Sequence, residues 1–112
     1  MSADSLQGSL DGGWRLVGGH GRVLYRFEIA DRGLGGPTVE GAWRDLRARA
    51  RGAHCGYLSS IAREGDELQI RFEEPGVKPM VELTVRTARV GWRGELRRGG
   101  RMARVSLMRP DA

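Results

Sequence analysis

The sequence lacks the features that mark several large classes of protein. It contains one cysteine, Cys55, so no disulfide can form within the chain. Its first thirty residues include no apolar segment like that of a signal peptide. No run of apolar residues approaches the length of about eighteen that a membrane-spanning helix needs. We therefore expect a cytoplasmic protein with no membrane partner, whose core holds together without a covalent link.

Lysine is almost absent, because Lys78 is the only lysine among nineteen basic residues and the others are arginines. Arginine, glycine and alanine dominate together, as they do in bacterial proteins from GC-rich genomes. The net charge of +5 raises nucleic acid as a partner. However, fourteen acidic residues are interspersed with the basic ones, as the surface of a soluble protein requires. The composition therefore favours an ordinary soluble surface over a nucleic-acid partner.

Proline is also scarce, with four residues against eighteen glycines in a chain of 112. This ratio is typical of a β protein with many turns rather than of collagen or disorder. The length predicts one domain with one modest core. We assign that domain to residues 10–112 and expect residues 1–9 to be a flexible N-terminus.

Apolar residues alternate with polar ones along most of the chain, which is the pattern of strands with one buried face. The segment "RVLYRFEIA" is one example, with Tyr25 and Phe27 on one face and Arg26 and Glu28 on the other. Glycine-rich or proline-rich turns separate most of these segments. We predict eight strands, at residues 12–18, 21–30, 37–46, 55–63, 66–74, 79–87, 89–98 and 101–109.

Two segments do not follow this alternation. Apolar residues occupy odd positions up to Val85 and even positions from Val90, so a turn or bulge is expected at 86–89, although no glycine marks it. Residues 43–53 have the spacing of a short helix at Leu46 and Ala50, but too few apolar residues line one side. We prefer a strand followed by a loop there.

Eight short strands joined by tight turns predict an all-β, antiparallel, up-and-down meander. Such a sheet has two exposed edges unless it closes on itself. With eight strands, closure gives a β-barrel that holds side chains and room for one small ligand. Exposed edges would also suit a homodimer.

The N-terminal Gly12-x-Trp14 resembles the signature of the calycin superfamily, which includes lipocalins, avidins and small bacterial metalloprotease inhibitors. In that superfamily the tryptophan of the first strand lies at one end of the barrel. An arginine or lysine that ends the last strand covers its ring. The resemblance implies that Arg109 is this partner, and Arg109 has the same parity as the inward-facing Val105 and Leu107. It implies a calycin-like barrel in which Trp14 is structural and lies away from the ligand.

The interior of the predicted barrel is the main candidate for a function. Its inward positions are Tyr25, Phe27, Val39, Trp43, Tyr57, Leu68, Ile70, Phe72, Leu83, Val85, Trp92 and Leu96. Gly41 and Gly94 have the same parity and would leave space for a ring or a ligand. Asp45 is in phase with Trp43 near a strand end, where a carboxylate can hydrogen-bond a ligand or pair with an arginine. The candidate ligand-binding residues are therefore Tyr25, Trp43, Asp45, Tyr57 and Trp92.

Other combinations of reactive residues do not form a recognisable site. His54 and Cys55 are adjacent on a predicted strand, so their side chains point to opposite faces and cannot act as a catalytic pair. Two distant histidines and one cysteine do not make a zinc site. We predict no catalytic residue, metal or cofactor.

Two arginine-rich segments raise the possibility of phosphate binding. The segment "RRGGR" at 97–101 resembles an RNA-binding box, but Gly99-Gly100 is also a good hairpin turn. The segment "RDLRARAR" at 44–51 would add further arginines to a basic rim. No aromatic residues are interleaved with these arginines, so a stacking surface for single strands is missing. The arginines concerned are Arg44, Arg47, Arg49, Arg51, Arg97, Arg98 and Arg101.

The sequence therefore predicts a non-catalytic protein that binds a small, largely apolar ligand in a β-barrel. The first alternative is a protein-interaction or protease-inhibitor module that uses residues 1–9. The others are an arginine-rimmed nucleic-acid binder and a barrel cyclase or isomerase with Asp45 or Tyr57 as its acid. A filled interior would direct attention to the outer surface.

Overall fold

Nine β-strands and one short 3-10 turn make up the described part of the computed structural model, which covers residues 10–31, 39–46 and 54–110. The turn, η2, is Gly19–Gly21. The strands are β1 (Gly12–Val17), β2 (Val23–Ala30), β3 (Glu40–Asp45), β4 (Cys55–Tyr57), β5 (Ser60–Glu64), β6 (Glu67–Phe72), β7 (Val81–Thr87), β8 (Trp92–Arg98) and β9 (Arg101–Met108).

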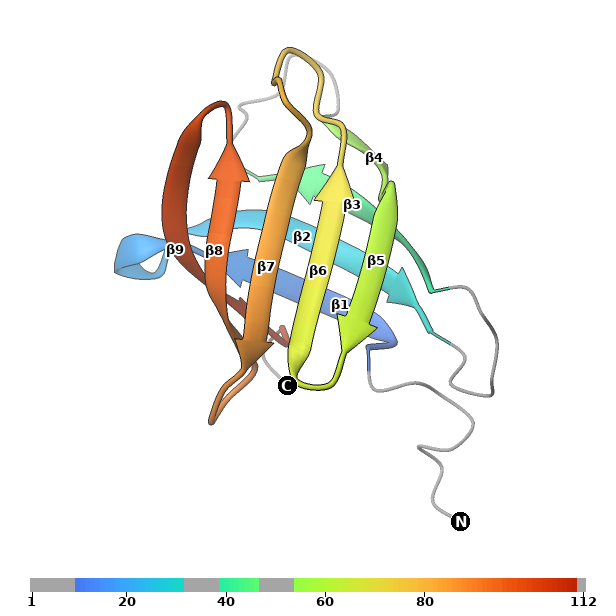
Figure 1. Cartoon of the computed structure of the whole chain (residues 1–112), viewed down its shortest axis with the longest axis vertical. Coiled ribbons are helices and arrows are strands. Elements are labelled where there is room, and N and C mark those ends of the chain that lie inside the picture. Colours follow the sequence, from blue (N-terminus) through green and yellow to red (C-terminus); the bar gives the residue numbers. More distant parts are fainter. Residues whose placement is uncertain (1–9, 32–38, 47–53, 111–112) are drawn as a thin grey trace.

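The strands form one antiparallel sheet in the order β4-β3-β2-β1-β9-β8-β7-β6-β5. Every neighbouring pair is consecutive in the chain except β1 and β9. The sheet curls into a half-barrel, in which β1–β3 cross behind β5–β8 and β9 joins the two walls (Figure 1). The expected all-β antiparallel meander is confirmed.

The sheet has nine strands rather than eight, and it does not close into a barrel. The predicted strand 55–63 is interrupted, because β4 pairs with β3 while β5 pairs with β6. At the interruption the Leu58 N–H donates to the Gly41 carbonyl at 2.7 Å, and the next N–H, of Ser59, donates to the Arg71 carbonyl at 2.8 Å. The chain thus leaves one wall and joins the other within two residues. An open seam remains between β3–β4 and β5–β6.

The concave interior is filled with side chains. Seventeen buried apolar residues form the core, and alternation along the strands places all of them on this face except Leu10, which precedes β1. Aromatic rings meet across the seam: Trp43 of β3 stacks on Phe72 of β6 with centroids 4.9 Å apart, and Tyr25 meets Phe72 edge-on at 5.2 Å. Such a pair contributes roughly 0.5–1.5 kcal/mol beyond its buried area. Side-chain packing therefore holds the seam where backbone pairing is missing.

The turn between β7 and β8 differs from the prediction. The strand expected at 89–98 begins at Trp92, and Val90, expected to face inward, is 66% exposed in the turn. The Ala88 N–H donates to the Gly91 carbonyl at 3.0 Å, and Gly91 has φ +67°. A glycine therefore does mark this turn. By contrast, the hairpin expected at Gly99-Gly100 is confirmed, with φ of +58° and +77°.

Some predictions fall outside the described residues. These are the flexible N-terminus at 1–9, the start of the strand predicted at 37–46, and the choice between helix and loop within 47–53. In the described part of the chain, no helix has the length and apolar character to cross a membrane.

Candidate functional site

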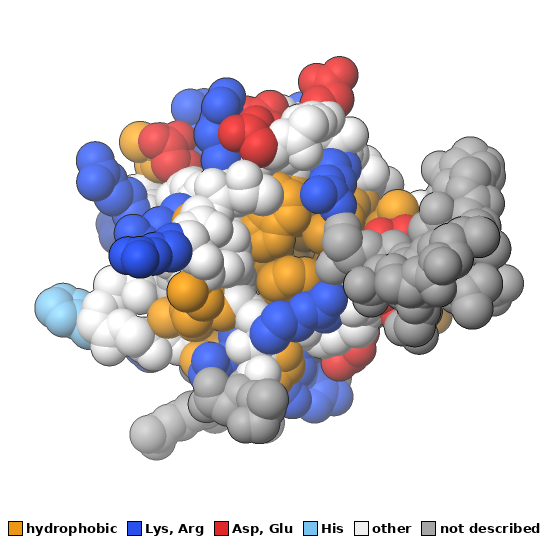
Figure 2. Space-filling view, turned by 90° about the horizontal axis from the view of Figure 1, so that it is seen from below, with side chains coloured by type: hydrophobic (Ala, Val, Ile, Leu, Met, Phe, Trp, Pro, Cys, Tyr) orange, Lys and Arg blue, Asp and Glu red, His pale blue; other side chains and the backbone are white. Residues whose placement is uncertain are grey.

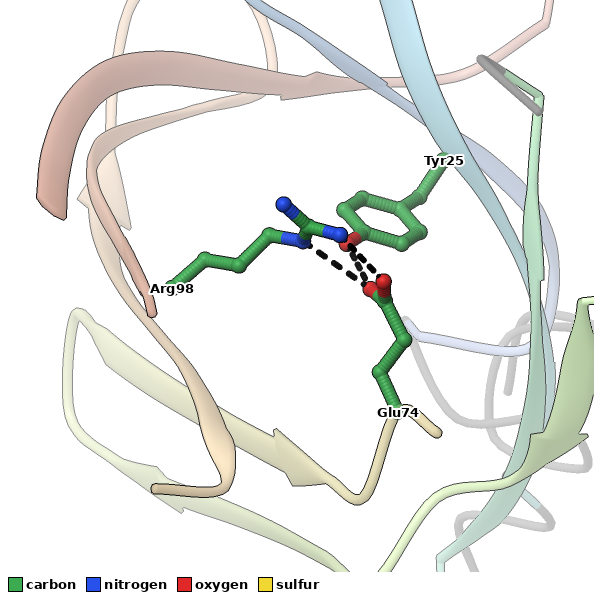
Figure 3. A network of polar contacts seen from close by, with 3 residues as sticks. All are labelled: Tyr25, Glu74 and Arg98. Atoms are coloured by element: carbon green, nitrogen blue, oxygen red, sulfur yellow. Dashed lines mark hydrogen bonds and ion pairs between the residues drawn. The ribbon is translucent and has the colours of Figure 1, made fainter. Parts of the chain in front are cut away.

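A buried carboxylate lies at the end of the half-barrel where β6 and β8 end. Glu74 is 5% exposed and is the one buried charged residue in the described part of the chain. Its Oε1 accepts a short hydrogen bond from the Tyr25 hydroxyl and a second from Nε of Arg98 at 3.1 Å. Its Oε2 forms a short ion pair with Nη2 of Arg98 (Figure 3). We call this end of the half-barrel the polar end.

Three separate elements, taken from both walls, supply the cluster. Tyr25 is an inward residue of β2 and is fully buried. Arg98 is the last residue of β8, and Glu74 is the second residue of the loop that follows β6. In that loop the Val77 N–H donates to the Glu74 carbonyl at 3.0 Å, and Gly76 has φ +79°. The tight turn folds the Glu74 side chain back over the interior.

The carboxylate of Glu74 remains ionised despite its burial. Burial raises its pKa, but the hydrogen bonds from Arg98 and Tyr25 and the charge of Arg98 lower the pKa further, so the net shift is downward. The hydrogen bond to Glu74 raises the pKa of Arg98. The pair is therefore fixed in its charged form at neutral pH.

An unpartnered donor lies at the same end. Nε1 of Trp43 is buried and has no hydrogen-bond partner among the described residues. It faces the backbone of Gly56 in β4, where an added Cβ would lie 3.1 Å away. The Trp43 ring also meets Tyr25 edge-on, with centroids 6.2 Å apart. A buried N–H without a partner costs free energy, so a hydrogen-bond acceptor of a ligand would be stabilised there.

The structure brings three of the five predicted ligand residues together. Tyr25, Trp43 and Asp45 lie at the polar end; Asp45 is half-buried and directly opposite Tyr25 in the β2–β3 register. The negative charge of Asp45 acts in the direction of raising the pKa of Glu74. The other two predicted residues, Tyr57 and Trp92, lie elsewhere.

The prediction that Tyr57 faces inward is wrong, because its side chain is 87% exposed. It lies on the outer face, and the interruption of the strand explains the error, since Leu58 is the residue that packs against the core. Trp92 does face inward and is 5% exposed. However, it begins β8 at the opposite end of the half-barrel from Arg98.

The opposite end has the contact that the calycin resemblance implies. The guanidinium of Arg109 lies 3.9 Å from the centre of the Trp14 ring, and its Nη1 donates to the Asp11 carbonyl at 2.6 Å. Gly12 makes room for it, because a Cβ there would lie 3.0 Å from Nη1. Arg63 covers Trp92 similarly, at 5.3 Å. Figure 2 shows apolar side chains at the centre of this end with basic ones beside them.

The two inward glycines do not leave room for a ligand. A Cβ at Gly94 would overlap the Thr84 carbonyl oxygen, and one at Gly41 would lie 2.7 Å from Cδ1 of Leu58. These glycines permit close packing instead. A hollow of about 280 Å³ lies on the outer surface beside the Gly99-Gly100 hairpin and is lined by Met80, Glu82 and neighbouring residues.

Sequence reasoning missed Glu74 and Arg98 as site residues, although a signal was present. Glu74 continues the inward series of Leu68, Ile70 and Phe72 by one step, and Arg98 continues that of Trp92 and Leu96. Alternation carried to the last residue of the predicted strands 66–74 and 89–98 would have placed both charges at one end of the interior.

No metal site is found in residues 10–31, 39–46 and 54–110, where no three His, Cys, Asp or Glu side chains come together. Cys55 is exposed. No family model, curated protein or solved structure matches the chain.

Proposed function

We propose that this chain is a non-catalytic, calycin-like binding protein that takes one small, largely apolar ligand at the polar end. The observation that supports this most is the unpartnered Nε1 of Trp43, buried beside the Tyr25–Glu74–Arg98 cluster. A ligand that places an acceptor on Nε1 and a ring against Phe72 would satisfy the donor and remain in apolar surroundings.

Access to this site is through the seam. The interior is already packed, so a ligand must displace side chains rather than enter an existing hollow. The seam lacks a backbone ladder, and β4 is only three residues long. Separation of β4 from the β6 wall is therefore the least costly way to open the interior. It exposes Trp43 first.

The first test is native mass spectrometry of the gently purified protein, followed by titration with 1-anilinonaphthalene-8-sulfonate, an apolar dye with an acceptor group. We expect a co-purified small molecule and saturable uptake of one dye. Trp43→Phe keeps an aromatic ring, though a smaller one, and removes the donor, so the dye should bind about fivefold more weakly, as for loss of one hydrogen bond.

Trp92→Phe is the matched control, because it makes the same change at the opposite end. Circular dichroism and thermal unfolding establish that both variants fold. Absence of both an adduct and saturable dye uptake would refute the proposal. So would an equal loss of affinity in the two variants.

A further inference from the structure

A row of directly opposed arginines crosses the outer face of the β1–β4 wall. Arg15 lies directly opposite Arg26 in the β1–β2 register, and Arg26 lies directly opposite Arg44 in the β2–β3 register. Directly opposite residues have Cβ atoms about 4.5–5.5 Å apart, and like charges in such pairs repel. We call these three residues the arginine row.

The other wall arranges its arginines differently. Arg71 and Arg97 both lie opposite Glu82, and Arg104 lies opposite Glu95. Each of these arginines faces an opposite charge. Within the described residues, by contrast, neither Arg26 nor Arg44 forms an ion pair, and both are exposed. The other wall also has directly opposed arginines, Arg86 with Arg93 and Arg98 with Arg101. However, Arg86 forms an ion pair with Glu67, and Arg98 forms one with Glu74.

An exposed aromatic ring lies beside this row. Tyr57 is opposite Ala42, two residues from Arg44 on the same face of β3, and is 87% exposed. Diagonal neighbours of this kind are about 7–8 Å apart, within reach of long side chains. The outer face thus combines aligned positive charge with a stacking ring, the two elements of single-strand binding surfaces.

From this juxtaposition we propose that the outer face of β1–β4 binds single-stranded nucleic acid, with phosphates on the arginine row and a base stacked on Tyr57. The row spans two strand spacings, about 10 Å, along which a nucleic-acid strand carries two or more phosphates. A bound polyanion relieves the repulsion within the row. This site is independent of the ligand site at the polar end.

The shape of the charged area favours a strand over a membrane surface. Glu28 and Glu40 lie on the same face of β2 and β3, below the row, and both are exposed. They confine the positive charge to a stripe. A stripe follows one phosphate backbone, whereas an anionic membrane attracts a broad basic face.

The test is fluorescence anisotropy of the full chain with short, labelled oligouridylate and oligothymidylate over a range of salt concentrations. Each phosphate contact contributes about 0.7 to the slope of log affinity against log salt for a single strand. Arg26→Gln with Arg44→Gln should therefore reduce the slope by about 1.4. The control pair, Arg71→Gln with Arg104→Gln, removes the same charge from the other wall and should change the slope little.

Substitutions of Tyr57 test the role of its ring separately. Tyr57→Ala should weaken binding roughly 5- to 150-fold, the range measured for base stacking, with an unchanged salt slope, whereas Tyr57→Phe should bind like the parent. The proposal is overturned if the control pair lowers the slope as much as the row pair. It is also overturned if duplex binds as tightly as single strands, or if phosphatidylserine vesicles bind and the oligonucleotides do not.

Discussion

The ion pair between Glu74 and Arg98 provides the sharpest test of the polar end. In Glu74→Gln one of the two acceptor oxygens becomes an N–H₂ group that faces the donors of Arg98 or Tyr25. At least one charge-assisted hydrogen bond is lost, which is worth about 1.5–3 kcal/mol. The Arg98 side chain is 35% exposed, so its charge remains hydrated. We therefore expect the free energy of unfolding to fall by about 2–3 kcal/mol.

Removal of the other partner should cost more. Arg98→Met leaves the carboxylate of Glu74 buried without its counter-charge, a change that costs about 3–5 kcal/mol at buried sites. The double variant combines Glu74→Gln with Arg98→Met, so its neutral amide needs no counter-charge. We expect the double variant to be at least as stable as Arg98→Met alone. The effects of the two substitutions on the free energy of unfolding are then strongly non-additive.

The effect of Glu74→Gln should also depend on pH. Folding lowers the pKa of Glu74 below its ordinary value near 4.5, so its carboxylate stabilises the folded state fully above that pH. The contribution is lost as the pH falls through the lowered, folded-state pKa. The difference in stability between parent and variant should thus be constant near neutral pH and shrink in acid.

Urea unfolding of the parent, the two single variants and the double variant, from pH 7 downward, measures both the non-additivity and the pH dependence. Glu95→Gln, on the exposed outer face, is the control. A loss of stability in Glu74→Gln no larger than that in Glu95→Gln would refute the stabilising role of the ion pair. Additive losses in Glu74→Gln and Arg98→Met would refute it as well.

Three further predictions concern stability and are measured by urea or thermal unfolding. Trp14→Ala should lose about 3–5 kcal/mol, as large core truncations do, whereas Arg109→Gln should lose only about 0.5–2 kcal/mol from the cation–π contact; equal losses would contradict the geometry. Gly94→Ala should cost about 1–3 kcal/mol, because its Cβ would overlap the carbonyl oxygen of Thr84; a neutral effect would show that the strands can separate there. Arg26→Thr should raise stability by about 0.2–1 kcal/mol for each like-charge pair removed, and a loss of stability would contradict the register.

Alternation of apolar residues was sufficient to predict the strands and most of the core. The inward positions Tyr25, Phe27 and Trp43 are buried as expected, because a one-residue shift would have exposed every one of them. The same rule also reaches Glu74 and Arg98, which end the predicted strands 66–74 and 89–98 in the inward phase. Neither was predicted as a ligand-binding residue, because charged residues normally mark the outer face. Their mutual neutralisation is a tertiary property that alternation does not encode.

The position of Tyr57 could not be predicted by assuming one continuous strand. Leu58 and Ile61 both pack against the core, although they are three residues apart and an unbroken strand would place them on opposite faces. The segment "YLSSI" therefore contains a change of phase, of the same kind that indicated the turn near Val90. The two serines gave no turn signal, so the interruption and the exposed ring were both missed.

This interruption accounts for both candidate surfaces. Because the chain passes from β3 to β6 between Leu58 and Ser59, backbone hydrogen bonds cannot close the seam, and Trp43 packs on Phe72 in their place. The ring that covers the seam carries the unpartnered Nε1 on the inner face. On the outer face the short β4 that results from the interruption holds Tyr57 beside Ala42. A closed eight-stranded barrel, with the segment 55–63 in a single phase, would have buried the tyrosine and left no seam at Trp43.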